Sequence, residues 1–243
     1  MGPSAEADQK LTPDQLERGA RTIALPGIGV SGQRLLRAAR ALVIGAGGLG
    51  SPVLQYLAAA GVGTIGIVDF DVVDLSNLQR QVIHAGSSVG EPKTLSATRA
   101  IAALDPSIAV VQHDTMLTAD NALAIFADYD LIVDGSDNFA TRYLANDAAA
   151  ILHKPYVWGS VLRFDGQVTV FWEHPGGESL DYRDVDPYRL RSCINHDLEP
   201  RSESRACAVD AMRVRIAETG RIEAHAAAEQ LDLEFYRFQH ERQ

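Results

Sequence analysis

The sequence is poor in the residues that mark several classes of protein. Of its 243 residues only two are cysteine and two are tryptophan. Two thiols are too few for a disulfide framework or a four-thiolate zinc site, so we expect a protein of a reducing compartment. The most apolar stretch, residues 57–68, is interrupted by glycine and too short to cross a bilayer. Because the first ten residues, MGPSAEADQK, also lack the apolar core of a signal peptide, the expected location is cytoplasmic.

Positive charge is scarce as well. The 22 Lys and Arg residues against 32 Asp and Glu give a net charge of −10, which argues against a nucleic-acid-binding surface. The length and the 46% of hydrophobic residues are typical of one globular domain with an appendage. The last 63 residues hold 23 of the 54 charged side chains. We therefore predict an amino-terminal arm over residues 1–30, a main domain over 31–180 and a polar carboxyl-terminal segment over 181–243.

Short apolar runs alternate with helical patterns through the main domain. We expect strands at 41–44, 64–68, 108–111 and 130–133, and helices at 52–60, 89–104, 121–127 and 139–152. This alternation predicts an α/β fold with a doubly wound, mostly parallel sheet of Rossmann type. Its ligand crevice would lie at the carboxyl ends of the strands.

The pattern changes near residue 160. Apolar runs at 161–164 and 167–172 flank Asp165-Gly166, which predicts an antiparallel hairpin that extends the sheet. Beyond it the signals weaken: 210–218 has a weak helical pattern, and Leu231, Leu233 and Phe235 alternate with charged residues as in a half-buried strand. Residues 179–206 carry arginines and two prolines, so we expect an extended crossover there.

A glycine-rich motif follows the first expected strand and opens the first helix. Its glycines are Gly45, Gly47, Gly48 and Gly50. Glycine allows a sharp turn and a close approach to phosphate, and the helix amino terminus offers free N–H groups. Asp69 ends the next strand, where a carboxylate accepts hydrogen bonds from ribose hydroxyls. Nucleotide binding is preferred to a pure packing role, but these residues fit a dinucleotide as well as ATP.

Two cations follow Asp69 in the chain, Arg80 and Lys93. Arg80 closes a polar run made of Ser76, Asn77, Leu78 and Gln79. A forked guanidinium and a compact ammonium suit the charges of a triphosphate under attack, whereas a nicotinamide site needs an apolar slot. The alternative is that both are solvated surface cations. Because Pro92 precedes Lys93, the sequence excludes a P-loop.

An acidic cluster, Asp134-Gly-Ser-Asp137-Asn138, ends the fourth expected strand. A carboxylate at this position can hold Mg²⁺ between phosphate oxygens, with water completing the octahedron, and Asp137 is the candidate. The alternative is an Asx turn or the N-cap of the following helix. Asp134 is expected to support the loop.

Taken together, these motifs resemble the ThiF/MoeB family of adenylyltransferases, relatives of the ubiquitin-activating enzymes. The resemblance covers residues 15–187 and rests on GAGGLGSPVLQYLAAAGVGTIGIVDFDVVDLSNLQRQVIH, VGEPK and DGSDNFATRYLANDAA. It implies that Mg·ATP activates the terminal Gly-Gly carboxylate of a ubiquitin-fold sulfur-carrier protein, giving an acyl-adenylate and pyrophosphate. It also implies a homodimer, a separate sulfur donor, and a pathway of the molybdopterin or thiamine type.

The resemblance implies roles for the candidate residues. The resemblance implies that the main domain is an ATP-binding adenylation domain. In it, Gly48 lies against the nucleotide and Asp69 holds the ribose. Ser76, Asn77 and Arg80 contact the phosphates, Lys93 stabilises the charge of the α-phosphate, and Asp137 positions magnesium with Asn138 beside it. Arg21 matches an arginine that reaches the ATP of the other subunit, although the aromatic residue and histidine usual beside it are absent.

The resemblance lapses after residue 187. Cys193 follows a serine, as does a cysteine that in some members links to the carrier or donor, but its surroundings differ, so a nucleophile and an ordinary thiol both stay open. Cys193, His196 and Cys207 form an irregular set and the paired Cys-x-x-Cys site is absent, so structural zinc is not expected. His84 and His113 are interpreted as structural or surface residues.

Three alternatives stay open. An NAD(P)-dependent oxidoreductase would share the glycine motif and Asp69 but leaves Arg80 and Lys93 unexplained. An enzyme that activates a small carboxylate on tRNA is disfavoured by the acidic charge. A nucleotide-binding family member that has lost carrier adenylation through its altered carboxyl terminus would bind ATP without further chemistry.

Overall fold

The three-dimensional structure is a computed structural model that describes residues 10–162, 165–172, 181–185, 211–216 and 222–227. The chain divides into two compact units, Met1–Ser136 and Asp137–Gln243. None of the helices within the described ranges is long and apolar enough to cross a membrane.

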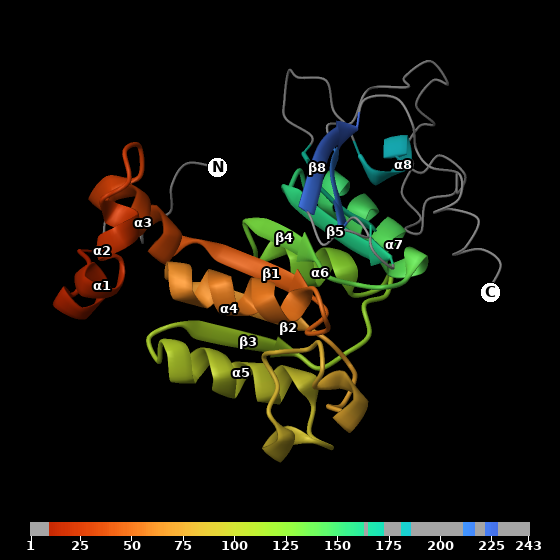
Figure 1. Cartoon of the computed structure of the whole chain (residues 1–243), viewed down its shortest axis with the longest axis horizontal. Helices are drawn as coiled ribbons and strands as arrows, with labels where there is room; N and C mark the ends of the chain where they lie inside the picture. Colours follow the sequence, from red (N-terminus) through yellow and green to blue (C-terminus); the bar gives the residue numbers. More distant parts are fainter. Residues whose placement is uncertain (1–9, 163–164, 173–180, 186–210, 217–221, 228–243) are drawn as a thin grey trace. The chain divides into compact units, whose positions relative to one another are not determined.

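Four parallel strands form the sheet of the first unit. They are β1 (Arg40–Ile44), β2 (Thr64–Val68), β3 (Ala109–His113) and β4 (Leu131–Asp134), in the spatial order β3-β2-β1-β4 (Figure 1). The chain first progresses from β1 to β3 in one direction and then returns to the other side of β1. The crevice at the carboxyl ends of β1 and β4 is therefore a switch point, where folds of this type bind ligands.

Helices connect these strands. Helix α4 (Gly50–Ala60) joins β1 to β2, α5 (Lys93–Leu104) joins β2 to β3, and the two helices pack against each other (Figure 1). Helix α6 (Ala122–Ala127) leads back to β4, so right-handed crossovers place it on the opposite face of the sheet. The first unit thus confirms the doubly wound Rossmann-like sheet expected from the sequence.

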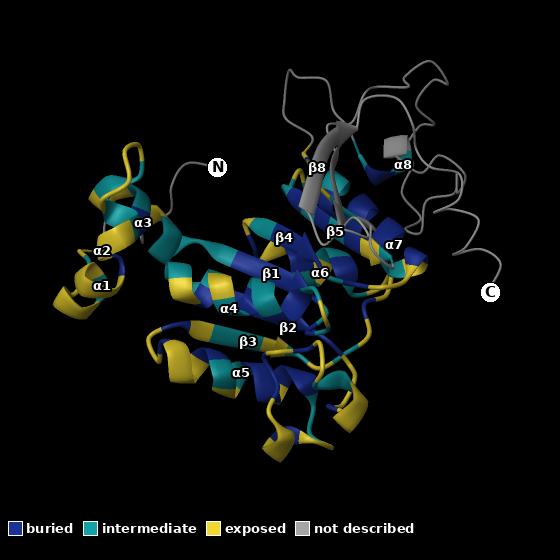
Figure 2. Ribbon diagram, in the orientation of Figure 1, coloured by how far each residue is buried: buried dark blue, intermediate teal, exposed yellow. Residues whose placement is uncertain are grey.

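The core of this unit lies on both faces of the central strands. Leu42 and Val43 are adjacent on β1 and both are fully buried, as expected for a parallel strand covered on its two faces. Figure 2 shows the same dark blue core on the facing sides of the helices. Leu54 and Ala58 of α4 contribute at helical spacing, and so do Ala97 and Ile101 of α5.

Three helices precede the sheet: α1 (Pro13–Arg18), α2 (Ala20–Ile23) and α3 (Gly29–Ala38). They attach to the first unit through the carboxyl-terminal ends of α4 and α5. The Arg18 guanidinium donates to the carbonyl of Leu104 at 2.7 Å, and the Gln33 amide donates to the carbonyl of Ala60 at 2.9 Å. Both acceptors are last-turn carbonyls that have no partner within their own helix.

The second unit contains α7 (Phe139–Ile151), β5 (Tyr156–Leu162), β6 (Asp165–Phe171), α8 (Tyr182–Val185), β7 (Ala211–Ile216) and β8 (Ile222–Ala227). Strands β5 to β8 pair antiparallel in chain order. Trp158 packs between Phe171 of β6 and Tyr182 of α8, with ring centroids 6.4 and 5.1 Å away. Arg183 donates two hydrogen bonds to the buried Asp147 carboxylate, at 2.9 and 2.7 Å, which ties α8 to α7.

The structure corrects the position of the hairpin turn. The antiparallel pair is confirmed, but Leu162 pairs with Asp165 and Val161 with Gly166, so Asp165-Gly166 lies inside β6. The first strand of the pair, β5, begins at Tyr156 rather than at residue 161 as expected. Burial of alternate residues from Tyr156 to Ser160 sets this register, and it overrides the local turn preference of Asp-Gly.

Two helix predictions are also wrong. Helix α5 begins at Lys93 rather than Val89, because Gly90 has a φ of +89° and its N–H donates to the Val73 carbonyl after β2, while the Val73 N–H donates to the Glu91 carbonyl. Residues 211–216, expected to be helical, form β7 paired with β6. Met212, Val214 and Ile216 alternate with arginine in the sequence, and this period of two matches a strand.

Several expectations lie outside the described residues. These are the half-buried strand at Leu231, Leu233 and Phe235, the thiol of Cys193, the set of Cys193, His196 and Cys207, and most of the crossover at 179–206.

The glycine turn after β1 yields a test of the fold. A Cβ on Gly50 would lie 1.8 Å from the carbonyl oxygen of Gly45, so Gly50→Ala forces the backbone apart. We expect it to lower the free energy of unfolding in urea by about 3 kcal/mol. Gly86→Ala is the matched control, since a Cβ there meets nothing within 4 Å, and it should stay within about 0.5 kcal/mol of the parent. Equal stability of the two variants would contradict this packing.

Candidate functional site

The four glycines of the motif divide into two pairs. Gly45 has a φ of +85°, and Gly50 lies too close to Gly45 for any side chain, so both are required by the protein's own packing. A Cβ on Gly47 or Gly48 would instead meet only side-chain atoms, at 3.7 Å or more. The absence of side chains at Gly47 and Gly48 therefore leaves open space above the turn, as the approach of a phosphate requires.

Free backbone donors line this space. Helix α4 has no side-chain N-cap, since Leu49 occupies that position. Among the described residues, the N–H groups of Gly47, Gly48 and Leu49 have no hydrogen-bond acceptor. Unpaired N–H groups at the amino terminus of an eleven-residue helix attract an anion, because the helix dipole adds to their partial charge.

Ala46, which lies between Gly45 and Gly47, is held by three side chains. The N–H of Ala46 donates to Asp69 Oδ2 at 2.8 Å. Its carbonyl accepts from His84 Nε2 at 2.9 Å and from Ser51 Oγ at 3.3 Å. Ala46 is itself fully buried. The turn is thus fixed to the end of β2 and to the loop before α5.

Asp69 is buried at the end of β2, 8% exposed. Oδ2 accepts from Ala46, and Oδ1 accepts from the N–H of Asp71 at 2.9 Å. Each carboxylate oxygen has a second lone pair, so Asp69 can position the turn and still accept from a diol.

His84 is the buried support that the sequence interpretation left undefined. Because a carbonyl only accepts, Nε2 carries the proton, and Nδ1 accepts from Ser96 Oγ at 3.0 Å in the neutral ring. Burial lowers the pKa of His84, and the charge of Lys93 adds to the effect against the Ala46 and Asp69 interactions. His84 therefore stays neutral near pH 7 and holds the Ala46 carbonyl.

The two cations expected from the sequence differ in environment. Lys93 is only 6% exposed, and its Nζ donates to Asp71 Oδ2 at 2.8 Å. Arg80 is exposed, its alkyl chain lies beside Gly48, and no acidic side chain among the described residues pairs with it. In a chain of net charge −10, an arginine without an acidic partner beside a turn of free N–H groups provides an anion site.

The polar run before Arg80 is a compact turn. Asp74 caps a short 3₁₀ helix, η2 (Leu75–Asn77), by accepting from the N–H of Ser76 at 2.7 Å. The Ser76 hydrogen bonds lower the pKa of Asp74. Arg80 continues the turn, with its N–H donating to the Asn77 carbonyl at 3.0 Å and its Nη1 to the Ser76 carbonyl at 3.2 Å. The run therefore positions the guanidinium at the glycine turn.

The remaining candidates are on other segments of the chain. Asp137 is exposed and Asn138 caps α7 by accepting from the Thr141 N–H at 2.9 Å, both at the start of the second unit. Asp134 accepts from the N–H of Ser136 and supports its loop as expected. Arg21 is exposed on α2, which precedes β1 in the chain, whereas the glycine turn follows the carboxyl end of β1. No cluster of three acidic, histidine or cysteine side chains in the described ranges could hold a metal.

The sequence analysis gave no site role to three residues of this neighbourhood, Asp71, Gln81 and Ser96, and it described His84 only as a structural or surface residue. Gln81 is 4% exposed, and its Oε1 is buried without a partner among the described residues. Only Gln81 had a usable signal, because it directly follows Arg80 in the polar run. The pairs Asp71–Lys93 and His84–Ala46 join residues 22 and 38 positions apart, which no local pattern reveals.

The lowered pKa of His84 predicts the pH dependence of stability. Between its folded pKa and the ordinary value of about 6.5, the unfolded chain binds the extra proton, so stability falls as the pH decreases below about 6.5. His84→Gln keeps a side-chain N–H donor but removes the titrating group. It should reduce the loss of unfolding free energy between pH 7 and about pH 5.5, measured in urea. An unchanged pH slope would contradict the neutral, buried His84.

Comparison with known proteins agrees with this geometry. The ThiF family model matches residues 20–228. A probable adenylyltransferase/sulfurtransferase, MoeZ of Mycobacterium tuberculosis, is 57% identical over 188 residues, which are 77% of this chain and 48% of MoeZ. The sulfur carrier protein adenylyltransferase of Thermus thermophilus is 53% identical over 166 residues, 68% of this chain and 61% of that protein. The matched region thus spans about half the length of these relatives.

A solved structure of E. coli MccB with AMPCPP and MccA has a TM-score of 0.66 at 17% identity and covers 93% of this chain and 74% of MccB. This likeness shows a shared fold. Since the family model spans most of the sequence and the identities to MoeZ and the Thermus protein exceed 50%, the chain belongs to the ThiF family.

Proposed function

We propose that this protein is an ATP- and Mg²⁺-dependent adenylyltransferase that activates the carboxyl-terminal Gly-Gly of a ubiquitin-fold sulfur-carrier protein. The observation that carries the proposal is the anion site at the glycine turn. There, three N–H groups that have no acceptor among the described residues adjoin an arginine that has no acidic partner among them. The names of the relatives, which include sulfur carrier protein adenylyltransferase, support the substrate class. The AMPCPP bound to MccB supports ATP as the nucleotide.

The proposed nucleotide lies with its ribose at Asp69 and its phosphates over the glycine turn. Asp69 accepts from the ribose hydroxyls at the end of β2, and the phosphates lie over Gly47 and Gly48. Arg80 then reaches the phosphates from the adjoining turn, with Ser76 and Asn77 beside it. A nicotinamide cofactor would need an apolar slot, whereas this turn supplies only donors and positive charge.

Lys93 supplies a positive charge that stabilises the negative charge developing on the α-phosphate in the reaction. A carboxylate oxygen of the carrier attacks the α-phosphorus, the new O–P bond forms, and the bond to the β-phosphate oxygen breaks as pyrophosphate leaves. The attacking carboxylate is ionised at neutral pH, so no general base is required. Lys93 exchanges its hydrogen bond to Asp71 for the α-phosphate, which stabilises the transition state by charge.

Three further features belong to the same proposal. Asp137 positions Mg²⁺, which when bound neutralises the phosphates, and Asn138 lies next to it in the chain. Arg21 acts on the ATP of the partner in a homodimer. The main domain, residues 31–180, carries the adenylation site, with residues 1–30 as an amino-terminal arm and 181–243 as an atypical carboxyl-terminal segment. A separate protein supplies the sulfur.

Charge removal tests the roles of the two cations. Arg80→Ala and Lys93→Ala should each lower carrier-dependent ATP–pyrophosphate exchange by about 10²–10³-fold, as expected for loss of a transition-state charge partner. Arg99→Ala is the matched control, because Arg99 is an exposed cation on α5 that pairs with Glu91. It should leave the exchange rate unchanged. Exchange at the parental rate in both site variants would overturn the assignment.

The substrate class has its own test. Incubation with Mg·ATP and candidate Gly-Gly carriers should yield a carrier whose intact mass has increased by one adenylate. A carrier that ends in Gly-Ala serves as the control and should remain unmodified. Binding of ATP with no adenylate on any carrier would favour a nucleotide-binding protein without this activity. Preference for NADH over ATP in a titration would favour an oxidoreductase.

A further inference from the structure

Gln81 directly follows Arg80, and the side chains of these two residues border the glycine turn. A Cβ on Gly48 would lie 3.7 Å from Cγ of Arg80, and a Cβ on Gly47 would lie 3.8 Å from Nε2 of Gln81. Outside the turn itself, Nε2 is the nearest atom to that Gly47 position. The amide nitrogen of Gln81 therefore lies at the edge of the open space in which the phosphates are proposed to bind.

The main chain of Gln81 is held on both sides. Its N–H donates to the Asn77 carbonyl at 2.9 Å, and its carbonyl accepts from the His84 N–H at 3.1 Å. The residue is only 4% exposed, whereas its neighbour Arg80 is exposed. A side chain that is already confined loses little conformational freedom when a ligand binds, so a hydrogen bond from Gln81 costs little entropy.

The two ends of the Gln81 amide differ in environment. Oε1 is enclosed by the protein and has no hydrogen-bond partner among the described residues. Nε2 also lacks an acceptor within the described ranges, but it keeps accessible surface. An approaching ligand therefore meets the donor end of the amide. An ionised phosphate has oxygens that accept hydrogen bonds, so it is the complementary partner.

A packing role alone does not account for a glutamine at this position. A buried acceptor without a partner destabilises the fold, and such groups are exceptional in folded proteins. Methionine has nearly the same length and would fill the same space without an unpaired oxygen. A ligand contact of Nε2 gives a reason for an amide in this place.

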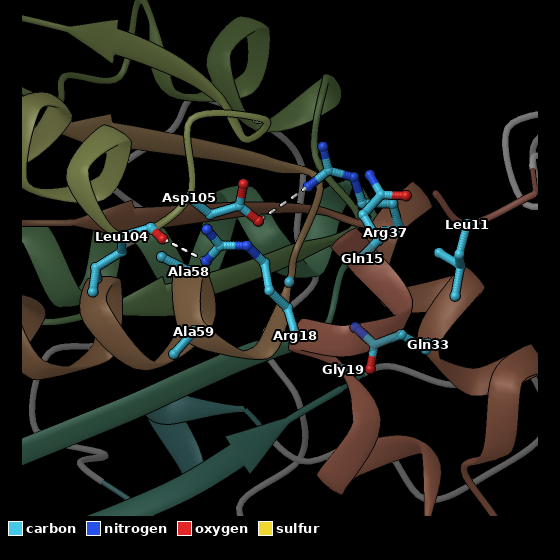
Figure 3. A pocket seen from close by; sticks show the side chains of 11 residues that line it. Leu11, Gln15, Arg18, Gly19, Gln33, Arg37, Ala58, Ala59, Leu104 and Asp105 are labelled. Atoms are coloured by element: carbon cyan, nitrogen blue, oxygen red, sulfur yellow. Dashed lines mark hydrogen bonds and ion pairs between the residues drawn. The ribbon is translucent and has the colours of Figure 1, made fainter. Parts of the chain in front are cut away.

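The opposite ends of α4 and α5 provide a comparison. A pocket of about 210 Å³ lies there, and the cations that line it have partners nearby (Figure 3). Arg18 donates to the Leu104 carbonyl at 2.7 Å, and Arg37 Nη1 lies 4.0 Å from Asp105 Oδ2. The donors at that end serve the attachment of the amino-terminal helices. Nε2 of Gln81 has no such partner in the described part of the chain.

We propose that Gln81 is a binding residue of the nucleotide site and that its Nε2 donates to a phosphate oxygen above Gly47. The inference rests on the proposed function, because it requires a nucleotide whose phosphates lie over the glycine turn. Arg80 and Lys93 contribute positive charge, whereas Gln81 contributes a neutral donor at a fixed position. Its hydrogen bond forms with the bound nucleotide and persists during the reaction, so it strengthens nucleotide binding without lowering the barrier of the chemical step.

Replacement of the amide tests this role. Gln81→Met removes the donor at nearly constant length. Isothermal titration calorimetry of the whole chain with Mg·ATP should show a Kd about tenfold to a hundredfold higher, as expected for loss of a hydrogen bond to a charged acceptor. Carrier-dependent ATP–pyrophosphate exchange should show the same rise in the KM for ATP with kcat unchanged. The free energy of unfolding in urea should not fall, because the unpaired Oε1 is removed with the amide.

Gln55→Met is the matched control. Gln55 is a glutamine on the second turn of α4 whose amide donates to the Val82 carbonyl at 3.4 Å, and its replacement should leave the Kd for Mg·ATP at the parental value. Parental affinity in Gln81→Met would overturn this inference alone. A loss of affinity that is matched by an equal loss of unfolding free energy would do the same, because it indicates a packing role. Failure of the parent itself to bind Mg·ATP would overturn the proposed function as well.

Discussion

The peptide groups of Ala46 are the point on which the site depends. Its N–H is bound by Asp69 from the end of β2, and its carbonyl is bound by His84 from the loop before α5. With the N–H and the carbonyl of Ala46 both occupied, the two peptide groups that flank this residue cannot rotate to satisfy their neighbours internally. The N–H groups of Gly47 and Gly48 are therefore kept free, and a free donor that is already oriented needs no reorganisation when an anion arrives.

The two cations of the site, Arg80 and Lys93, differ in their exposure and in their partners. Arg80 has no acidic partner in the described part of the chain, whereas Lys93 is buried and held by one carboxylate of Asp71. A buried ammonium without a partner would be costly, so the carboxylate of Asp71 stabilises Lys93. The Asp71 carboxylate therefore competes with a phosphate for the ammonium group of Lys93. In the function proposed above, the exposed Arg80 would attract the anion first and the shielded Lys93 would stabilise its charge.

The parts of the fold that depend on local periodicity could be predicted from the sequence. The strands at β1 and β2 and the helix at α4 match their expected ranges within two residues, because continuous apolar runs and helical spacing are short-range signals. The start of α5 could not be predicted, since Gly90 pairs with Val73 seventeen residues earlier. The same distinction between local and long-range signals holds for the site. Its motif residues could be recognised in the sequence, but the supporting contacts of His84 and Asp71 arise only when distant segments meet.

The two helices that form the site obey one electrostatic rule at both ends. Their amino termini expose N–H groups, which favour anions, and their carboxyl termini expose carbonyls, which favour donors. Arg18 and Gln33 are those donors, at Leu104 and Ala60. A carboxylate near these carbonyls gains nothing from the helix dipoles, which repel it there. The carboxyl-terminal ends therefore offer an anion no free backbone donor, whereas an anion at the glycine turn is attracted by backbone and side chains together. The two ends of the same helices consequently favour groups of opposite charge.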